Sequence, residues 1–111
     1  MQTDEPVRCG LTESTIARIT TQFTAVPEIE QVILYGSRAK GNFQKGSDID
    51  LVIKGELVSH SQLLSLENRL DDLLLPYSID LSLLHEISNP DLIDHIQRVG
   101  VILYEKSDKE L

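Results

Sequence analysis

Apolar residues recur along this chain with two different spacings, and segments of one spacing alternate with segments of the other. The first long segment repeats apolar residues at steps of three, four and three, so one side of a helix would be apolar: Ile16, Ile19, Phe23 and Val26. Thr12 precedes this segment and is a good N-cap residue, while Pro27 follows it and cannot continue a helix. The pattern therefore predicts a helix that begins after Thr12 and ends before Pro27.

Two further segments have the helical spacing, and each is bounded by residues that begin and end helices. The second begins near Ser59 or Ser61, repeats leucine at helical intervals and stops before Pro76. The third begins with Asn89, a favourable N-cap residue followed by a proline, and closes at Gly100. We therefore expect three helices, each with one apolar face.

Four short apolar runs of strand-forming residues separate and follow these helices. They lie at residues 31–35, 48–54, 78–84 and 101–105, and a glycine-containing connection of residues 36–47 joins the first two. This order of elements predicts an α/β (α+β) fold, with a small mixed sheet of three to four strands flanked by helices. We expect a flexible N-terminal segment at residues 1–10, one folded domain at 11–105 and a polar C-terminal tail at 106–111.

The length, charge and cysteine content of the chain narrow its function. With 111 residues it is expected to form one domain. Its formal net charge of −8 argues against extended nucleic-acid binding, because phosphate contacts need Lys and Arg. Cys9 is the single cysteine, so no disulfide forms within the chain, and a reducing, cytoplasmic setting is expected. No segment has the length of a membrane span or the pattern of a secretion signal.

Two aspartates interrupt the second predicted strand, although strands disfavour aspartate. Because side chains alternate across a strand, Asp48 and Asp50 share one face, and the other face carries Ile49, Leu51 and Ile53. Asp80 lies in the third predicted strand, again between apolar residues. If these two strands are neighbours, three carboxylates gather on one side of the sheet.

Three gathered carboxylates need compensation, because like charges a few ångströms apart cost stability. A divalent cation is the usual compensation, and oxygen ligands suit Mg²⁺ or Mn²⁺ better than Zn²⁺. We expect His60, His85 and His95 to be surface or helix-face residues rather than ligands. For Asp80 taken alone, a solvent-facing position at a strand edge is the competing interpretation.

The connection before Asp48 has the features of a phosphate-binding turn. Gly36 lets the backbone approach a ligand closely, and backbone N–H groups with the Ser37 hydroxyl form a cradle for phosphate. Arg38, Lys40 and Lys45 follow, so the local charge is positive within an acidic chain. A simple glycine turn with solvated basic residues is the alternative for this stretch alone.

The stretch GSRAKGNFQKGSDIDL resembles the signature of the polymerase-beta nucleotidyltransferase superfamily. More closely, it resembles that of the minimal nucleotidyltransferases (MNT), which pair with HEPN-domain proteins. The family's Gly-Ser falls on Gly36 and Ser37, and its Asp-x-Asp on Asp48 and Asp50. Its third carboxylate, on a later strand, falls on Asp80 by position and pattern. The resemblance covers nearly the whole chain and implies a polymerase-beta-like nucleotidyltransferase fold for residues 11–105.

The resemblance also implies the residues of the site. It implies that two Mg²⁺ ions, with Mn²⁺ as an alternative, are held by the catalytic and metal-binding residues Asp48, Asp50 and Asp80. It implies that the nucleotide is bound by Gly36, Ser37, Arg38, Lys40 and Ser47. Lys40 stands where many relatives carry Arg, and a contact to one phosphate oxygen tolerates that change.

The activity implied by the resemblance is transfer of AMP from ATP to a protein. MNT proteins act as antitoxins by placing AMP on a tyrosine hydroxyl of a HEPN toxin, so the expected role is a type VII-like antitoxin in a hetero-oligomer. Relatives that modify antibiotics or extend polymers carry further domains for the acceptor, which this chain is expected to replace with a partner or a second copy. We expect no membrane partner, and the homodimer remains an alternative.

Two other functions stay open at this point. The chain could neutralise a toxin by forming a stoichiometric complex, without catalysis. It could also carry out the same chemistry on a different acceptor, such as a small alcohol or an RNA end. The acidic charge makes RNA the weaker of these two acceptors.

Overall fold

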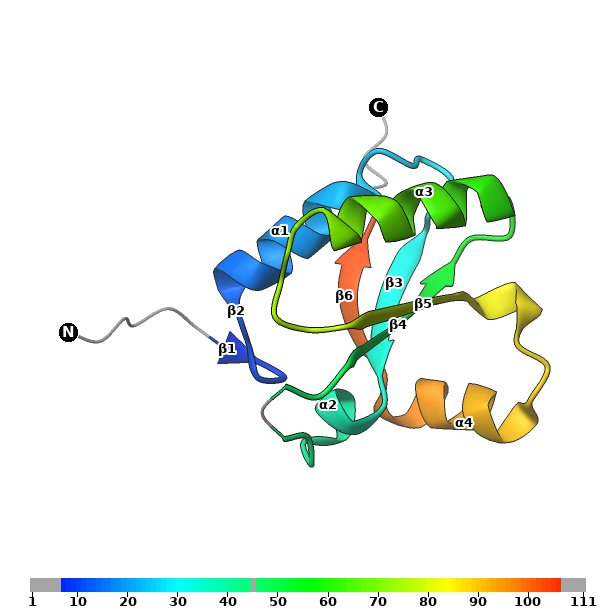
Figure 1. The fold of residues 1–111 in the computed structure, drawn as a ribbon. Coiled ribbons are helices and arrows are strands. Elements are labelled where there is room, and N and C mark those ends of the chain that lie inside the picture. The colour runs from blue at the N-terminus through cyan, green and yellow to red at the C-terminus, as the bar shows by residue number, and fades with distance from the viewer. Residues whose placement is uncertain (1–6, 45, 107–111) are drawn as a thin grey trace.

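A four-stranded mixed sheet lies at the centre of the protein (Figure 1), whose computed structural model describes residues 7–44 and 46–106. The strands are β3 (Gln31–Tyr35), β4 (Ile49–Lys54), β5 (Ile79–Leu83) and β6 (Val101–Glu105). Their order across the sheet is β5-β4-β3-β6. β3 pairs antiparallel with β4 and β6, whereas β4 and β5 are parallel. The α+β fold with a small mixed sheet, predicted from the sequence, is therefore confirmed.

Helices cover both faces of the sheet. The helix α1 (Glu13–Phe23) and the helix α3 (His60–Asp71) lie side by side on one face, and α4 (Pro90–Val99) lies on the other (Figure 1). Each helix begins at a side-chain cap that the sequence suggested. The side chain of Thr12 accepts a hydrogen bond from the Thr15 N–H at 3.2 Å, Ser59 forms a capping box, and Asn89 caps the third helix.

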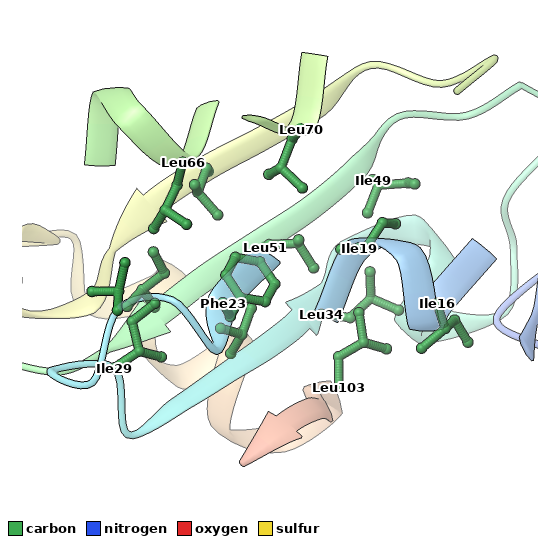
Figure 2. Close-up of a cluster of buried hydrophobic side chains, with 14 of the residues drawn as sticks. Ile16, Ile19, Phe23, Ile29, Leu34, Ile49, Leu51, Leu66, Leu70 and Leu103 are labelled. Atoms are coloured by element: carbon green, nitrogen blue, oxygen red, sulfur yellow. The ribbon is translucent and has the colours of Figure 1, made fainter. Parts of the chain in front are cut away.

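The alternation of residues along β4 divides the sheet into two packing surfaces. Ile49, Leu51 and Ile53 are fully buried in the main core beneath α1 and α3 (Figure 2). Burial of each such side chain is worth about 1.5–3 kcal/mol, so these residues anchor the strand. Val52 points the other way and packs with Ile96 of α4. Asp50 shares that second side with Val52, since residues two apart on a strand face the same way.

Several short elements were not predicted from the sequence. β1 (Val7–Arg8) and β2 (Leu11–Thr12) form a two-stranded hairpin, and a 3-10 turn spans Leu84–Glu86. The one-turn helix α2 (Ser37–Lys40) instead lies where the sequence indicated a short turn or helix after the first strand. Leu11 of the hairpin is fully buried in the main core. Residues 1–6 of the expected flexible segment and 107–111 of the expected tail lie outside the described residues, so the domain limits remain predictions.

The ends of the longer helices fall earlier than their prolines suggested. α1 ends at Phe23, and residues 24–26 form turns before Pro27. α3 likewise ends at Asp71, ahead of Pro76. No helix within residues 7–44 and 46–106 combines the length and the apolar character that a membrane crossing requires.

Candidate active site

Three polar side chains lie in one row across the α4 face of the sheet. Tyr35 of β3 is the register partner of Asp50 on β4, and Asp50 is the register partner of Asp80 on β5. Register partners on adjacent strands point to the same face and are separated by about 4.8 Å. Asp48 is exposed and directly precedes β4. The structure thus places Asp50 and Asp80 side by side, with Asp48 at the start of the same strand.

The electrostatics of this row reflect the crowding of negative charge. Burial raises the pKa of Asp50, and the neighbouring carboxylates of Asp80 and Asp48 raise it further. Burial also raises the pKa of Tyr35, and Asp50 and Asp80 add to that rise, against the effect of a side-chain hydrogen bond with Ser82. A cation would relieve this repulsion, because it favours the ionised form of every carboxylate around it.

The side-chain oxygens of Asp48, Asp50 and Asp80 are suitable ligands for a hard divalent cation. All three aspartates offer oxygen ligands, which Mg²⁺ and Mn²⁺ prefer. Among residues 7–44 and 46–106, however, no three His, Cys, Asp or Glu side chains are grouped closely enough to form a ready metal site. The chemistry of the donors therefore fits Mg²⁺, and the metal-binding role of Asp48, Asp50 and Asp80 stays a prediction.

Gly36 connects β3 to α2 and lies directly against Asp50. Its backbone has φ 79° and ψ −156°, a conformation that is essentially restricted to glycine. A Cβ atom at this position would overlap with the carboxylate of Asp50. Two independent constraints, the backbone conformation and the approach to Asp50, therefore require glycine here.

The residues that follow Gly36 turn the chain through α2. The Lys40 N–H donates to the Gly36 carbonyl at 3.1 Å, and Gly41 closes the turn with φ 87°. Ser37 is half-buried at the first position of α2, while Lys40 is exposed. Ser37 directly follows Gly36, whose backbone lies against Asp50, and the contacts of Ser37 and Lys40 to a nucleotide stay predictions. Lys45 lies outside the described residues.

Arg38 has a different environment from the one expected of a phosphate ligand. Its side chain is only 2% exposed. The guanidinium donates from Nε and Nη2 to the Ser47 carbonyl at 3.1 and 2.9 Å, and from Nη1 to the Cys9 carbonyl at 2.9 Å. It also lies 5.0 Å from the ring centre of Phe43 and 4.8 Å from that of Tyr77. These contacts join the N-terminal hairpin to the loop before Asp48, which is a structural role.

Ser47 closes the loop that leads into the Asp-x-Asp strand. Its hydroxyl accepts a hydrogen bond from the Gln44 N–H at 2.8 Å, and its own N–H donates to the Gln44 carbonyl at 2.9 Å. Because its carbonyl also accepts from Arg38, the hydroxyl, N–H and carbonyl of Ser47 are all hydrogen-bonded. The nucleotide-binding roles proposed for Arg38 and Ser47 from the sequence stay predictions, and both residues have well-defined structural contacts.

His95 is a site residue that the sequence reasoning did not assign. Its Nε2 accepts a hydrogen bond from the Gly36 N–H at 3.1 Å. Its ring meets that of Tyr35 edge-on, with 6.3 Å between ring centres and an interplanar angle of 81°. His95 lies three residues after Leu92 and four before Val99, so the helical periodicity already placed it on the sheet-facing side of α4. His60 instead pairs with Glu86 at the surface.

Solved structures with the same fold include several toxin–antitoxin complexes. A chain of a toxin–antitoxin crystal structure with AMP-PNP matches with a TM-score of 0.67 and 20% identity, covering 82% of this chain and 73% of that one. A chain of the MntA-HepT toxin–antitoxin matches at 0.64 and 18%, covering 86% and 74%. A chain of the complex of a tri-AMPylated Shewanella oneidensis HEPN toxin with an MNT antitoxin matches at a TM-score of 0.58 and 19% identity, covering 85% of this chain and 70% of that one. At these identities the likeness establishes the fold.

Sequence comparison identifies the family directly. The curated proteins include no significant match to this chain. The family model described as "Polymerase beta, Nucleotidyltransferase" matches residues 17–109. That span contains Gly36-Ser37, the Asp48-x-Asp50 strand, Asp80 and all four strands of the central sheet. The chain therefore belongs to the polymerase beta nucleotidyltransferase family.

Proposed function

We propose that this protein is a Mg²⁺-dependent nucleotidyltransferase that transfers AMP from ATP to a hydroxyl group, expected to be a tyrosine hydroxyl, of a partner HEPN toxin. The transfer would silence the toxin, so the protein would act as an antitoxin. The observation that carries the proposal is the register of Asp50 with Asp80, beside a Gly36 turn that only glycine can form. The nearness of Asp50, Asp80 and Gly36 supports a single site in which the acidic residues hold the metal and the Gly-Ser turn holds the nucleotide.

The acidic residues would hold the metal and the turn would hold the nucleotide. Asp48, Asp50 and Asp80 supply the oxygen ligands, and their mutual repulsion favours the bound cation. Two Mg²⁺ ions, when bound, supply stabilisation of the triphosphate charge and lower the pKa of the attacking hydroxyl. The hydroxyl and backbone N–H of Ser37 would seat the terminal phosphates, with Gly36 letting the backbone approach them closely and the exposed Lys40 neutralising charge.

The reaction itself is an in-line displacement at phosphorus. The acceptor hydroxyl oxygen forms a bond to the α-phosphorus of ATP, the bond from that phosphorus to the oxygen bridging to the β-phosphate breaks, and pyrophosphate leaves. The hydroxyl proton moves to a nearby base, for which Asp80 is the candidate because it is exposed at the edge strand β5. Catalysis of this kind rests on positioning and electrostatic stabilisation.

The proposed acceptor rests on the partners and ligands of proteins with a similar fold. Three of the similar structures are toxin–antitoxin complexes, one containing AMP-PNP and one containing a tri-AMPylated HEPN toxin. Those ligands and partners belong to those proteins. For this chain they support ATP as the donor and a HEPN toxin as the acceptor.

The proposal is tested by incubating the protein with Mg-ATP and a cognate HEPN toxin, and measuring the intact mass of that toxin. We expect one or more added AMP groups, and no addition with Asp48→Asn or Asp50→Asn. Asp71→Asn, on the exposed end of α3, is the matched control and should transfer normally. No added mass with the wild-type chain would overturn the enzymatic proposal.

The same variants separate catalysis from stoichiometric neutralisation. If an Asp48 and Asp50 double variant binds the partner and still silences it, complex formation alone explains the antitoxin effect. If the double variant binds without silencing, transfer is required. Added nucleotide on an RNA end or a small alcohol, with none on the protein, would instead change the acceptor and keep the chemistry.

A further inference from the structure

The Gly36 amide is held by a side chain from a distant part of the chain. His95 on α4 accepts the Gly36 N–H at Nε2 over 3.1 Å, and the two residues are 59 positions apart. Gly36 is also the residue whose backbone lies against the carboxylate of Asp50. One hydrogen bond thus ties α4 to the turn that separates the carboxylates from Ser37.

The hydrogen bond defines the protonation state of His95. A backbone N–H is always a donor, so Nε2 must offer a lone pair, and the ring proton must lie on Nδ1. An imidazolium has no acceptor and could not make this bond. The edge-on contact with Tyr35 supports the ring in this orientation.

The hydrogen bond between His95 and Gly36 helps to hold the backbone conformation of Gly36. Gly36 adopts a backbone conformation that costs energy and persists only where its surroundings impose it. The Lys40 N–H donates to the Gly36 carbonyl, and the Gly36 N–H donates to His95, so the peptide groups on both sides of the Gly36 Cα are held by hydrogen bonds. Without His95, the turn would lose the contact that keeps Gly36 close to Asp50 and Ser37 at the start of α2.

We propose that His95 is a positioning residue of this site: its unprotonated Nε2 holds the Gly36 amide, so that the turn bearing Ser37 stays in register with Asp50. His95 itself touches neither the nucleotide nor the acceptor in this role. The kinetic consequence rests on the proposed nucleotidyl transfer, whereas the hydrogen bond and its protonation state do not.

The first test is spectroscopic and needs no activity. In ¹⁵N-labelled protein, we expect a coupling across the hydrogen bond between the Gly36 amide nitrogen and His95 Nε2, and ring nitrogen shifts typical of a proton on Nδ1. In His95→Gln, whose side-chain carbonyl reaches a similar distance, the Gly36 amide proton should keep its downfield shift. In His95→Phe, which keeps a ring but has no acceptor, that shift should be lost. Absence of the coupling in the wild-type protein would overturn the inference, whether or not the chain transfers nucleotide.

The second test links the bond to function. We expect His95→Phe to lower kcat/KM for nucleotide transfer about 10-fold, the effect of one lost hydrogen bond on a positioned group, and His95→Gln to stay within about 3-fold of wild type. His60→Phe is the matched control, since His60 lies at the surface and pairs with Glu86. Equal activity in His95→Phe and wild type would overturn the positioning role, as would a His95→Gln variant as impaired as His95→Phe. If the bond is observed but the wild-type chain transfers no nucleotide, the positioning role falls together with the proposed function.

Discussion

Asp50 on β4 and Asp80 on β5 are direct register partners on two parallel strands. Their side chains therefore point from the same face of the sheet at neighbouring positions. The pairing joins residues 30 positions apart in sequence, and it makes Asp80 the neighbour of the Asp-x-Asp motif. The crowding of charge at Asp50 follows from this register, and the first prediction follows from that crowding.

Asp50→Asn should make the protein more stable at neutral pH while removing its activity. The pKa of Asp50 is raised above the usual value of 3.8, mainly by burial and then by Asp80 and Asp48, so the folded state holds this proton more tightly than the unfolded state. Ionisation of Asp50 therefore costs stability as the pH rises from 3.8 through the folded pKa, and the cost is constant above it. Removing the charge removes the cost. Transfer should fall by on the order of 100-fold or more.

Thermal unfolding as a function of pH measures this effect. The difference in Tm between Asp50→Asn and wild type should be positive at pH 7 and shrink as the pH falls towards 3.8. Asp71→Asn, at an exposed position on α3, is the matched control measured over the same pH range. A variant that is less stable than wild type at pH 7 would contradict the account of charge crowding.

Gly36→Ala should impair both stability and activity. Alanine is strained at φ 79° and ψ −156°, and its Cβ would overlap with the Asp50 carboxylate, so the turn must shift away from the carboxylates. We expect a loss of about 1–3 kcal/mol in the free energy of unfolding, together with loss of transfer. Urea unfolding and the intact-mass assay measure the two effects.

Gly41→Ala isolates the contribution of the contact with Asp50. Gly41 has φ 87° and ψ 2°, and a Cβ there meets nothing within 4 Å. Gly41→Ala should therefore lose only about 1 kcal/mol in the free energy of unfolding, the cost of an alanine in a left-handed conformation, and should retain nucleotide transfer. Equal effects of the two substitutions would show that backbone strain, and not the approach to Asp50, explains the requirement for Gly36.

Much of this arrangement could be predicted because local patterns determine it. The strand at 31–35 and the strand at 101–105 were predicted at their observed limits, since β-branched runs bounded by glycine and charged residues have clear ends. The caps Thr12 and Asn89 were also correct, because a single side chain satisfies the first amides of each helix. The placement of Ile49, Leu51 and Ile53 on one face of β4, with Asp50 on the other, followed from the alternation alone.

The remaining features depend on contacts that no local pattern specifies. The guanidinium of Arg38 is buried because distant carbonyls, of Cys9 and Ser47, lie within its reach. Nothing in the basic run of residues 38–45 distinguishes that outcome from a solvated or phosphate-bound side chain. His95 similarly meets Gly36 only because α4 packs on β3, a tertiary contact between segments far apart in the chain. Helix ends were misjudged for a smaller reason, since turns preceded each proline.

Arg38→Lys should lower stability rather than change nucleotide affinity alone. Lysine cannot span the carbonyls of Ser47 and Cys9 with three donors in a planar fork, so buried acceptors would lose partners. We expect a loss of about 2–3 kcal/mol, measured by urea unfolding. Arg98→Lys is the matched control: Arg98 forms an exposed pair with Asp94 and should change stability by less than about 0.5 kcal/mol. Unchanged stability in Arg38→Lys, with weaker ATP binding, would instead assign Arg38 to the nucleotide.

Mg²⁺ alone should stabilise the folded protein through the acidic row. The folded state brings Asp50 and Asp80 together, whereas the unfolded chain does not, so the ion binds the folded state preferentially. At an ion concentration ten times the dissociation constant, the gain is about 1.4 kcal/mol, or roughly 5 °C or more in Tm for a domain of this size. Asp80→Asn should remove most of this gain, while Asp71→Asn should keep it. A Tm that does not rise with Mg²⁺, or one that rises equally in Asp80→Asn, would show that this pair of carboxylates does not bind the ion.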